Sequence, residues 1–353
     1  MAKTPYLYDK LASAGARFGE YHGVETAAAF TDPKAEYRAL HSGCGVFDYA
    51  WRVQFKVTGE DRVRWLNGMV TNNVRDLAVN HGVYCFLLNP QGHILGDMYV
   101  FNPGDALQIE TDASQGQALV EVFDKYIIMD DVELDAPAPR SAAGVAGPKA
   151  EEVLERAGFS AGGLAPLEVR KVSGAEFEVT LIRLPYPVEA YEVLFAPESA
   201  AKVWDGQVTA GATPVGYEAL ELWRVSLGVP RYAQDIRQRD LPQETEQQHA
   251  LHFTKGCYVG QEIVERIRSR GQVHRKLTGL VIDGPAPPPG TKISAGGKAV
   301  GEITSVASLP SANGKDTTVA LGYIRREAGA PGAVVQVEGA QATVTALPVP
   351  EAR

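Results

Sequence analysis

The run from Asp283 to Gly290, which reads Asp-Gly-Pro-Ala-Pro-Pro-Pro-Gly, limits the possible folds more than any other feature of the chain. Proline lacks the backbone N–H that a helix or a sheet needs, so no regular element can cross these residues. Before the run, helix-like and strand-like patterns alternate; after it, every apolar segment is short and strand-like. We therefore expect a large part with both helices and strands, followed by a small all-β part.

The residues after this run predict a small antiparallel barrel. Glu338-Gly339 separates two of the short apolar segments, as in a hairpin turn. Short strands joined in this way close most naturally into a barrel. The expected strands are Ala299–Thr304, Thr318–Tyr323, Val334–Val337 and Ala342–Ala346.

The larger part predicts an α+β sandwich. Helices are expected at Tyr6–Phe18 and Pro33–His41. The following segments have the order β-α-β-β-β-α-β, which is close to a split βαβ unit. They are Gln54–Thr58, a helix holding Val63 and Leu66, Tyr84–Leu88, Ile94–Phe101, Leu107–Thr111, Ala113–Tyr126 and Val132–Leu134.

A second, similar cycle begins after the proline-containing connection Asp135–Arg140. The phrases VTGEDRVRWL near Val57 and VAGPKAEEVL near Val145 share a pattern, which suggests that one unit is duplicated.

Composition excludes several classes of protein. The 353 residues carry a formal net charge of −9, which disfavours a general nucleic-acid surface. Three well-separated cysteines form neither a disulfide framework nor a metal clip, so no metal site is predicted. No uninterrupted apolar run exceeds six residues, and the first residues do not resemble a signal peptide. We expect a soluble, cytoplasmic protein.

The densest group of chemically active residues is Lys255–Glu262, with the sequence KGCYVGQE. Cys257 precedes an expected helix over Ile263–Arg270 and lies two residues from Lys255. A helix dipole and a nearby cation both favour a thiolate, so Cys257 is a candidate reactive thiol. The alternative is an inert, buried cysteine in a tight turn.

The stretch from Lys255 to Lys276 has six basic and two acidic residues, a local charge of +4. It could bind an anion, such as a carboxylate-bearing cofactor, or a nucleic-acid backbone. The alternative is a solvated helix face with salt bridges, including one between Glu262 and Arg266.

Two carboxylates interrupt apolar strand patterns. Asp97 lies within Ile94–Phe101, after the turn sequence NPQGH, and Glu192 lies between Tyr191 and Val193. A carboxylate there usually has a partner or a function, although either could be a strand residue facing solvent.

The whole chain resembles the folate-binding superfamily of the glycine-cleavage T-protein (aminomethyltransferase) and the YgfZ-type proteins of iron–sulfur cluster maintenance. The resemblance rests on TPYLYDKLASAGARF, GVFDYAWRVQFKVTGED, YCFLLNPQGHILGDMYVF and VGEITS, and KGCYVGQE is similar to the signature of the YgfZ branch. It implies a three-domain cloverleaf around a tetrahydrofolate channel. The expected domains are 1–50 with 141–272 (folate-binding), 51–140 (ferredoxin-like) and 273–353 (barrel).

The resemblance also implies site residues. Asp97 matches an aspartate beside the reactive folate nitrogens, but Gly96 stands where T-proteins are acidic. Glu192 matches the position that holds the amino-pyrimidine edge of the pterin, where a carboxylate can accept two N–H bonds. Arg183 and Arg224 match arginines suited to the glutamate-tail carboxylates. Tyr191 and Trp223 are expected to stack on the pterin.

Two functions follow from the resemblance. The first is a tetrahydrofolate-binding accessory factor for [4Fe–4S] enzymes, including those that modify tRNA, with Cys257 as its thiol and Lys255 as the electrostatic partner. Since a cluster usually needs four thiolates, any cluster contact would be shared with a partner protein. The second is a folate-dependent aminomethyltransferase in which Asp97 orients or deprotonates the incoming group. The expected partners are folate and iron–sulfur assembly or client proteins, with no membrane, no direct nucleic-acid binding and a monomeric state.

Overall fold

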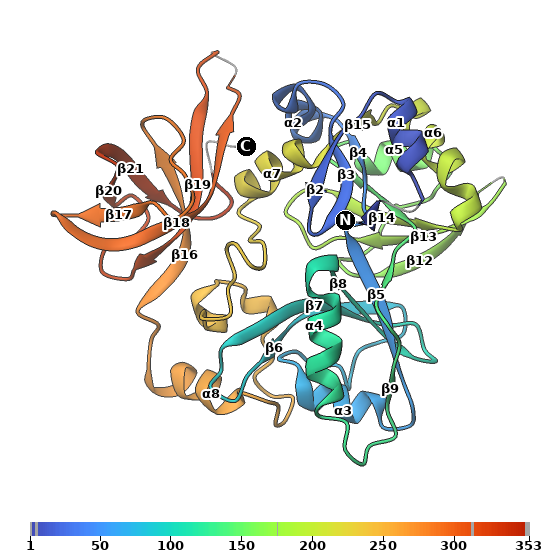
Figure 1. The fold of residues 1–353 in the computed structure, drawn as a ribbon, viewed down its shortest axis with the longest axis horizontal. Helices are drawn as coiled ribbons and strands as arrows, with labels where there is room; N and C mark the ends of the chain where they lie inside the picture. The colour runs from blue at the N-terminus through green and yellow to red at the C-terminus, as the bar shows by residue number, and fades with distance from the viewer. Residues whose placement is uncertain (1, 4–5, 175, 312–313, 350–353) are drawn as a thin grey trace. The chain divides into compact units, whose positions relative to one another are not determined.

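The computed structural model describes residues 2–3, 6–174, 176–311 and 314–349 (Figure 1). The chain forms two compact units, one of residues 1–85 with 98–220 and the other of residues 86–97 with 221–353. The three-domain division drawn from the resemblance stays a prediction.

The first unit contains a six-stranded sheet in the order β10-β5-β8-β7-β6, with β9 also paired to β5. Two helices, α3 (Arg62–Met69) and α4 (Ala113–Asp124), pack on one face of this sheet, where Phe123 of α4 contacts both Trp65 of α3 and Phe55 of β5. The tip of the β6–β7 hairpin, residues 86–97, belongs to the second unit. The strands are β5 (Arg52–Thr58), β6 (His81–Leu88), β7 (Ile94–Asn102), β8 (Leu107–Asp112), β9 (Glu133–Leu134) and β10 (Ala138–Pro139).

A second six-stranded sheet in the same unit has the order β12-β13-β14-β11-β4-β15. Its apolar core includes Val153 of α5 and Trp204 of α6, so both helices cover one face. The elements are β4 (Gly45–Asp48), β11 (Ala142–Ala146), α5 (Ala150–Arg156), β12 (Val169–Ser173), β13 (Glu178–Arg183), β14 (Ala190–Phe195), η1 (Pro197–Ser199), α6 (Ala200–Thr209) and β15 (Thr213–Pro214).

The two sheets repeat one topology. In each sheet, the first of four consecutive strands lies beside the last one, and the other two follow in reverse order. The order is β5-β8-β7-β6 in the first sheet and β11-β14-β13-β12 in the second. A helix follows the first strand and another follows the last strand in each case. The shared connectivity supports the duplication suggested by the phrases near Val57 and Val145.

The helix-free faces of the two sheets meet inside the first unit. Phe101 of β7 packs with Leu167 and with Ile182 of β13 in one buried cluster, with Tyr99 and Leu194 beside it. Successive side chains on a strand point to opposite faces. Residues that alternate with the helix-facing core therefore lie between the sheets, which is where buried charges can pair across the interface.

The N-terminal residues differ from the sequence-based expectation. A helix over Tyr6–Phe18 is wrong, because α1 covers only Tyr8–Ser13 and the chain then enters β2 (Arg17–Tyr21). Gly15 has φ +84°, a left-handed conformation that ends the helix. β2 pairs with β3 (Val24–Ala29), and β3 pairs with β1 (Ala2–Lys3). The expected second helix is confirmed as α2 (Pro33–Ser42).

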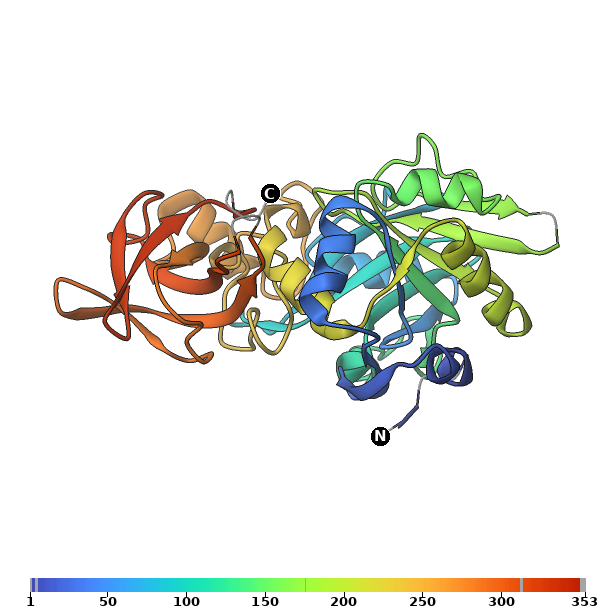
Figure 2. The same cartoon turned by 90° about the horizontal axis from the view of Figure 1, so that it is seen from above.

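The second unit contains a closed six-stranded barrel, visible in Figures 1 and 2. Its order is β16-β19-β18-β17-β20-β21, and the Glu338-Gly339 turn joins β20 to β21 as predicted. The strands are β16 (Arg275–Ile282), β17 (Lys292–Ala295), β18 (Lys298–Leu309), β19 (Thr317–Arg325), β20 (Val334–Val337) and β21 (Ala340–Thr345). The predicted combination of split βαβ sheets and a C-terminal antiparallel barrel is therefore confirmed.

The remaining helices connect these parts of the chain. They are α7 (Tyr217–Leu227), η2 (Pro242–Glu244), η3 (Gln248–Ala250) and α8 (Gln261–Arg270). Among the described residues, no helix has both the length and the apolar character needed to cross a bilayer.

Candidate functional site

Five charged side chains form a buried cluster between the two sheets of the first unit, and we call it the interface cluster. It consists of two guanidinium groups and three carboxylates. Arg52 lies on β5, Glu110 and Asp112 lie on β8, Arg140 lies in the connection after β10, and Glu192 lies on β14. Buried charges are costly unless they are paired, so this grouping needs an explanation.

A chain of ion pairs runs through the cluster. Arg52 donates from Nε to Glu110 Oε1 at 2.8 Å and from Nη1 to Asp112 Oδ1 at 2.5 Å. Arg140 pairs with the other Glu110 oxygen through Nη1, and its Nε lies 3.1 Å from Glu192 Oε1. At the far end, His22 Nδ1 lies 3.2 Å from Asp112 Oδ2.

At the Glu192 end of this series of ion pairs, the buried polar atoms lack hydrogen bonds. Glu192 is fully buried, yet neither of its carboxylate oxygens forms a hydrogen bond with any residue that the structure describes. Nε of Arg140 is buried and likewise forms no hydrogen bond within the described ranges, whereas Nη1 is ion-paired with Glu110. The two groups are close enough to attract one another but are not aligned to bond. Such orphaned polar atoms need an explanation, and a functional role is one such explanation.

Burial shifts the pKa values of this pair in the expected directions. Burial raises the pKa of Glu192 above its ordinary value, although the charges of Arg140 and Arg52 oppose the shift. Burial lowers the pKa of Arg140, and Glu192 opposes that shift. Each shift favours the neutral form, so Glu192 and Arg140 hold their charges at the expense of stability.

Aromatic side chains surround the interface cluster. The Arg52 guanidinium lies 5.5 Å from the centre of the Tyr99 ring. Tyr49 is buried, and burial raises its pKa well above 10 while Glu192 and Tyr99 add to the rise. The Tyr49 hydroxyl therefore remains protonated and offers a neutral donor beside the charges.

Two other predicted ligand residues lie on the same sheet as Glu192 but do not share its surroundings. Tyr191 packs in the helix-facing core, and its hydroxyl donates to Glu151 at 3.4 Å. Adjacent strand residues face opposite sides, so Tyr191 does not wall the space that Glu192 faces, and the geometry does not support the predicted stacking role. Arg183, opposite Tyr191 on β13, is half-buried and donates to the Leu164 carbonyl at 3.0 Å.

Asp97 lies in the second unit on β7 and is half-buried. Burial raises the pKa of Tyr232 to about 12, and the negative charge of the Asp97 carboxylate adds to this rise. The Tyr232 hydroxyl donates to the Leu95 carbonyl oxygen at 2.5 Å, on the same strand as Asp97. The aspartate therefore lies beside a hydroxyl that stays protonated at neutral pH.

The structure brings together two motifs that lie far apart in the sequence, the β6–β7 turn and the Lys255–Glu262 loop. A Cβ at Gly260, in the Lys255–Glu262 loop, would lie 2.6 Å from the Asn89 carbonyl oxygen at the β6–β7 turn. Likewise, a Cβ at Gly92 would lie 2.7 Å from the Cβ of Ile263 in α8. Both glycines have positive φ values, +81° and +77°, so each supplies a turn and a close approach that other residues would hinder.

Cys257 is exposed on the loop before α8, whereas the other two cysteines are buried. Lys255 is 5% exposed, and its Nζ lies 5.0 Å from the centre of the Tyr258 ring. The Tyr258 hydroxyl is buried without a hydrogen-bond partner in the described parts of the chain. The burial expected in the alternative interpretation of Cys257 is therefore wrong, because this residue is exposed. The predicted effect of Lys255 and the helix on its reactivity stays a prediction.

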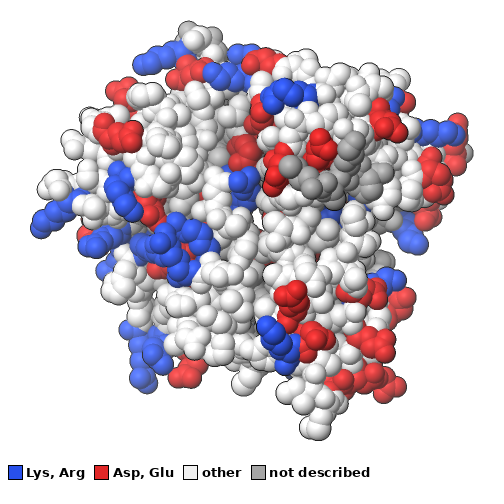
Figure 3. All heavy atoms as spheres, viewed as in Figure 1, with Lys and Arg blue, Asp and Glu red and all other residues white. Residues whose placement is uncertain are grey.

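The basic stretch is partly neutralised by its own helix. The predicted pair between Arg266 and Glu262 is confirmed at 3.2 Å, and Arg268 pairs with Glu265 at 2.8 Å. In Figure 3, Lys and Arg side chains gather on the left of the view, where Figure 1 shows β16 and α8. The paired arginines favour a solvated face with salt bridges over an extended polyanion site.

Arg224 lies in the second unit and is fully engaged by protein groups. It donates to both oxygens of Glu221 at 2.8 and 2.7 Å, and to Asp235 at 2.8 Å. Further bonds go to Ser305 Oγ at 2.9 Å and the Val229 carbonyl oxygen at 3.2 Å. An arginine saturated in this way holds the fold together, and the geometry does not support its predicted role with a ligand carboxylate. Trp223, its neighbour on α7, is buried.

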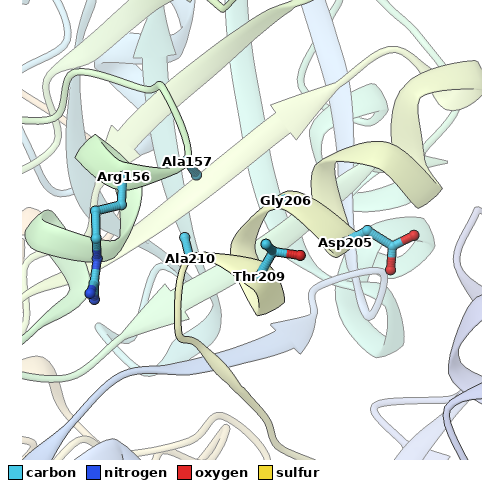
Figure 4. A pocket seen from close by; sticks show the side chains of 6 residues that line it. All are labelled: Arg156, Ala157, Asp205, Gly206, Thr209 and Ala210. Carbon is cyan, nitrogen blue, oxygen red and sulfur yellow. The ribbon is translucent and has the colours of Figure 1, made fainter.

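A surface depression lies elsewhere, between the ends of α5 and α6 (Figure 4). It is lined by Arg156, Ala157, Asp205, Gly206, Thr209 and Ala210, none of which belongs to the predicted site. Within the described ranges, no group of three or more His, Cys, Asp or Glu side chains is arranged to hold a metal.

Sequence reasoning missed Arg52, Glu110, Asp112 and Arg140. Glu110 and Asp112 interrupt an apolar strand as Asp97 and Glu192 do, and this signal was available. Arg140 follows two prolines in a connection, where its burial could not be foreseen.

Comparison with known proteins gives a consistent picture over the full length of the chain. A model described as the GCVT N-terminal domain matches residues 7–255, and one described as the glycine cleavage T-protein C-terminal barrel domain matches residues 275–352.

Curated relatives are similar over nearly their whole length. An aminomethyltransferase of Thermus thermophilus is 29% identical, over 99% of both chains. An aminomethyltransferase of Rippkaea orientalis is 27% identical, over 96% of this chain and 93% of the relative. The crystal structure of glycine cleavage system aminomethyltransferase T from Bartonella henselae superposes with a TM-score of 0.87 at 21% identity, covering 99% of this chain and 98% of that one. That structural likeness establishes the same fold.

Proposed function

The chain belongs to the family of the glycine cleavage T-protein, and from this premise we propose that it is a tetrahydrofolate-dependent one-carbon transferase of the aminomethyltransferase type. The curated relatives that carry the name aminomethyltransferase support this proposal over the alternative of an accessory factor. The observation that carries it furthest is the unsatisfied carboxylate of Glu192.

The chemistry of the interface cluster fits a folate. A pterin presents two parallel N–H donors at its amino-pyrimidine edge, and a buried carboxylate with two free acceptor oxygens complements that edge. Neither Glu192 oxygen accepts a hydrogen bond from the described residues, although Oε1 is ion-paired with Arg140 in the free protein. Tyr49 and Tyr99, which surround the interface cluster, would supply aromatic walls.

Arg140 has to release Glu192 when a ligand binds there. Its guanidinium carries the same kind of planar N–H donors as a pterin edge, and it already lies 3.1 Å from Glu192. Arg140 would keep its charge partner on release, since it also pairs with Glu110. The Arg140–Glu192 ion pair therefore occupies the proposed pterin site in the free protein. When a ligand displaces Arg140 from Glu192, Arg140 stays paired with Glu110.

Asp97 is the proposed residue for proton handling. Tetrahydrofolate, when bound, supplies the nitrogens that accept the methylene. Asp97 would orient or deprotonate the incoming group, helped by its partial burial and by the Tyr232 hydroxyl nearby. Gly96 removes the acidic neighbour that T-proteins have, so we expect Asp97 alone to carry this task.

A transfer assay tests the enzyme proposal. Wild type incubated with tetrahydrofolate and an aminomethyl donor should form methylenetetrahydrofolate and release ammonia and the donor's carrier group. Asp97→Asn should lose at least about a hundredfold of that rate while still binding tetrahydrofolate. Asp283→Asn, an exposed aspartate in the same unit, is the control. No turnover by wild type despite tight binding would reject the transferase and leave the second candidate.

The second candidate is a YgfZ-type accessory factor for iron–sulfur enzymes, including those that modify tRNA. The exposed Cys257 beside the buried Lys255 in the KGCYVGQE loop favours it. This candidate includes the prediction that iron–sulfur assembly or client proteins are partners. The monomeric state, the cytoplasmic location and the three-domain division remain part of the proposal for either candidate.

Complementation tests this second candidate. Cells that lack the native gene receive either Cys257→Ser or Thr254→Ser, a control in the same loop, and the activity of a cluster-dependent enzyme is measured. The factor requires that Thr254→Ser restores activity and Cys257→Ser does not. Full rescue by Cys257→Ser would remove the thiol from the mechanism.

A further inference from the structure

The loop between α4 and β9 exposes large apolar side chains at one point of the first unit. Ile128 is 83% exposed and Met129 is 93% exposed, and Tyr126 beside them is 38% exposed. We call these three residues the apolar tip. Single exposed apolar residues need no explanation, but adjacent ones with this much exposure mark interaction sites.

The backbone on both sides of the apolar tip is fixed by hydrogen bonds. On one side, the Trp65 indole N–H donates to the Tyr126 carbonyl oxygen at 3.2 Å. On the other, Asp131 accepts from the Glu60 amide at 3.0 Å, and its own amide donates to Asp61 at 3.0 Å. The loop therefore presents Ile128 and Met129 in a defined position, which reduces the entropy lost on binding.

Acidic residues surround the apolar tip. Residues 124–135 contain five acidic side chains and one lysine, a net charge of −4. Asp130 is paired with Arg64 at 2.5 Å, whereas Asp124, Asp131, Glu133 and Asp135 are exposed. In Figure 1 this loop lies at the bottom of the view, and in Figure 3 the same place is an uncharged tip with acidic side chains beside it.

We propose that the apolar tip is a docking site for a partner protein that has an apolar pocket rimmed by Lys and Arg. A buried apolar centre with a charged rim is the usual anatomy of a protein interface, and methionine is enriched in such centres. The charge also decides against a membrane, because anionic headgroups repel a segment of charge −4. This site shares no residue with the interface cluster, so it is independent of the proposed folate chemistry.

A photo-crosslinking experiment with the full chain identifies the partner. A photoreactive amino acid replaces Met129, and the control carries it at Val334, an isolated apolar residue of the barrel that is 59% exposed. The protein captured at Met129 is then purified and its affinity is measured. Ile128→Ala combined with Met129→Ala should weaken binding at least about tenfold, and Val334→Ala should not change it.

Charge complementarity adds a second expected result: binding should weaken as salt increases. The double variant should fold normally, since the truncated side chains are exposed, and an unchanged melting temperature checks this. The proposal fails if Met129 captures no more protein than Val334, or if the purified protein binds the double variant as tightly as wild type. It also fails if the captured protein is a second copy of this chain, or if the apolar tip binds vesicles containing phosphatidylserine.

Discussion

A buried network of charged residues around Asp235 in the second unit and the interface cluster in the first unit differ in how completely they are satisfied. In the second unit, each carboxylate oxygen of Asp235 accepts two hydrogen bonds: Oδ2 from Arg224 and the Arg231 amide, and Oδ1 from Thr304 and Ser305. In the first unit, Glu192 is as deeply buried as Asp235 but accepts none from the described residues.

We propose that the difference separates a structural network from one that binds a ligand. Both networks lose hydration when the chain folds, and only hydrogen bonds can compensate for that loss. The Asp235 network is compensated within the protein, so it joins α7 to the barrel strand β18. The Glu192 network is compensated only in part, which is what a site completed by a ligand requires.

The largest expected effect is on the satisfied network. Asp235→Ala should destabilise the second unit by about 3–5 kcal/mol, because Arg224 keeps its buried charge while Thr304 and Ser305 lose their acceptor. Denaturant unfolding would measure the loss. Asp283→Ala is the control, and a loss no larger than that control would contradict the structural role of Asp235.

Glu192→Gln, in contrast to Asp235→Ala, should not lower the free energy of unfolding substantially. Removing one of three carboxylates from an interface cluster with two guanidinium groups leaves it neutral, so we expect the free energy of unfolding at pH 7 to stay within about 1 kcal/mol of wild type or to rise. A loss of about 3 kcal/mol or more in denaturant unfolding would show that the Arg140 pair stabilises the fold.

The pH dependence sharpens this comparison. The folded-state pKa of Glu192 is raised above its ordinary value of 4.5, so the folded protein binds more protons than the unfolded chain as pH rises above that value. The stability associated with this group is therefore fully present below pH 4.5 and is lost as pH rises through the folded-state pKa. The stability of Glu192→Gln relative to wild type should rise from pH 4.5 towards pH 8. A flat difference in unfolding free energy over this range would contradict the shift.

The smallest effects should come from a pair of serines. Ser305 Oγ donates to Asp235 at 2.7 Å and accepts from Gln234 at 2.8 Å, whereas Ser141 Oγ is buried without a hydrogen-bond partner in the described chain. Ser305→Ala should lower the unfolding free energy by about 1–2 kcal/mol, and Ser141→Ala should leave it unchanged or raise it. Equal effects would mean that the contrast between the networks has no energetic basis.

Local sequence patterns predicted the elements that depend on local chemistry. The strand Val334–Val337 was predicted with the observed bounds, because its β-branched residues and the Glu338-Gly339 turn specify it locally. Strand Ala142–Ala146 was not predicted, since alanine and glycine have low strand propensity. It forms because β4 and β14 pair with it on both sides and bury it completely.

The candidate site depends on contacts that no spacing reveals. Asp97 and Glu192 were identifiable as carboxylates within apolar strands, and KGCYVGQE was identifiable as a motif. That Arg140 pairs with Glu192, however, depends on how two sheets pack, and the sequence separates these residues by 52 positions. The same packing places Tyr191 on the opposite face from Glu192, which adjacency in the sequence conceals.

Calorimetric titration with tetrahydrofolate and 5-formyltetrahydrofolate, on wild type, Glu192→Gln and Glu178→Gln, tests most directly whether the unsatisfied network is a ligand site. Glu178 is an exposed glutamate on β13 and serves as the control. Wild type and Glu178→Gln should bind with micromolar affinity, and Glu192→Gln should bind at least about tenfold more weakly, since the carboxylate bonds are lost. Equal binding by all three proteins, or none by wild type, would contradict the assignment of Glu192 to the folate.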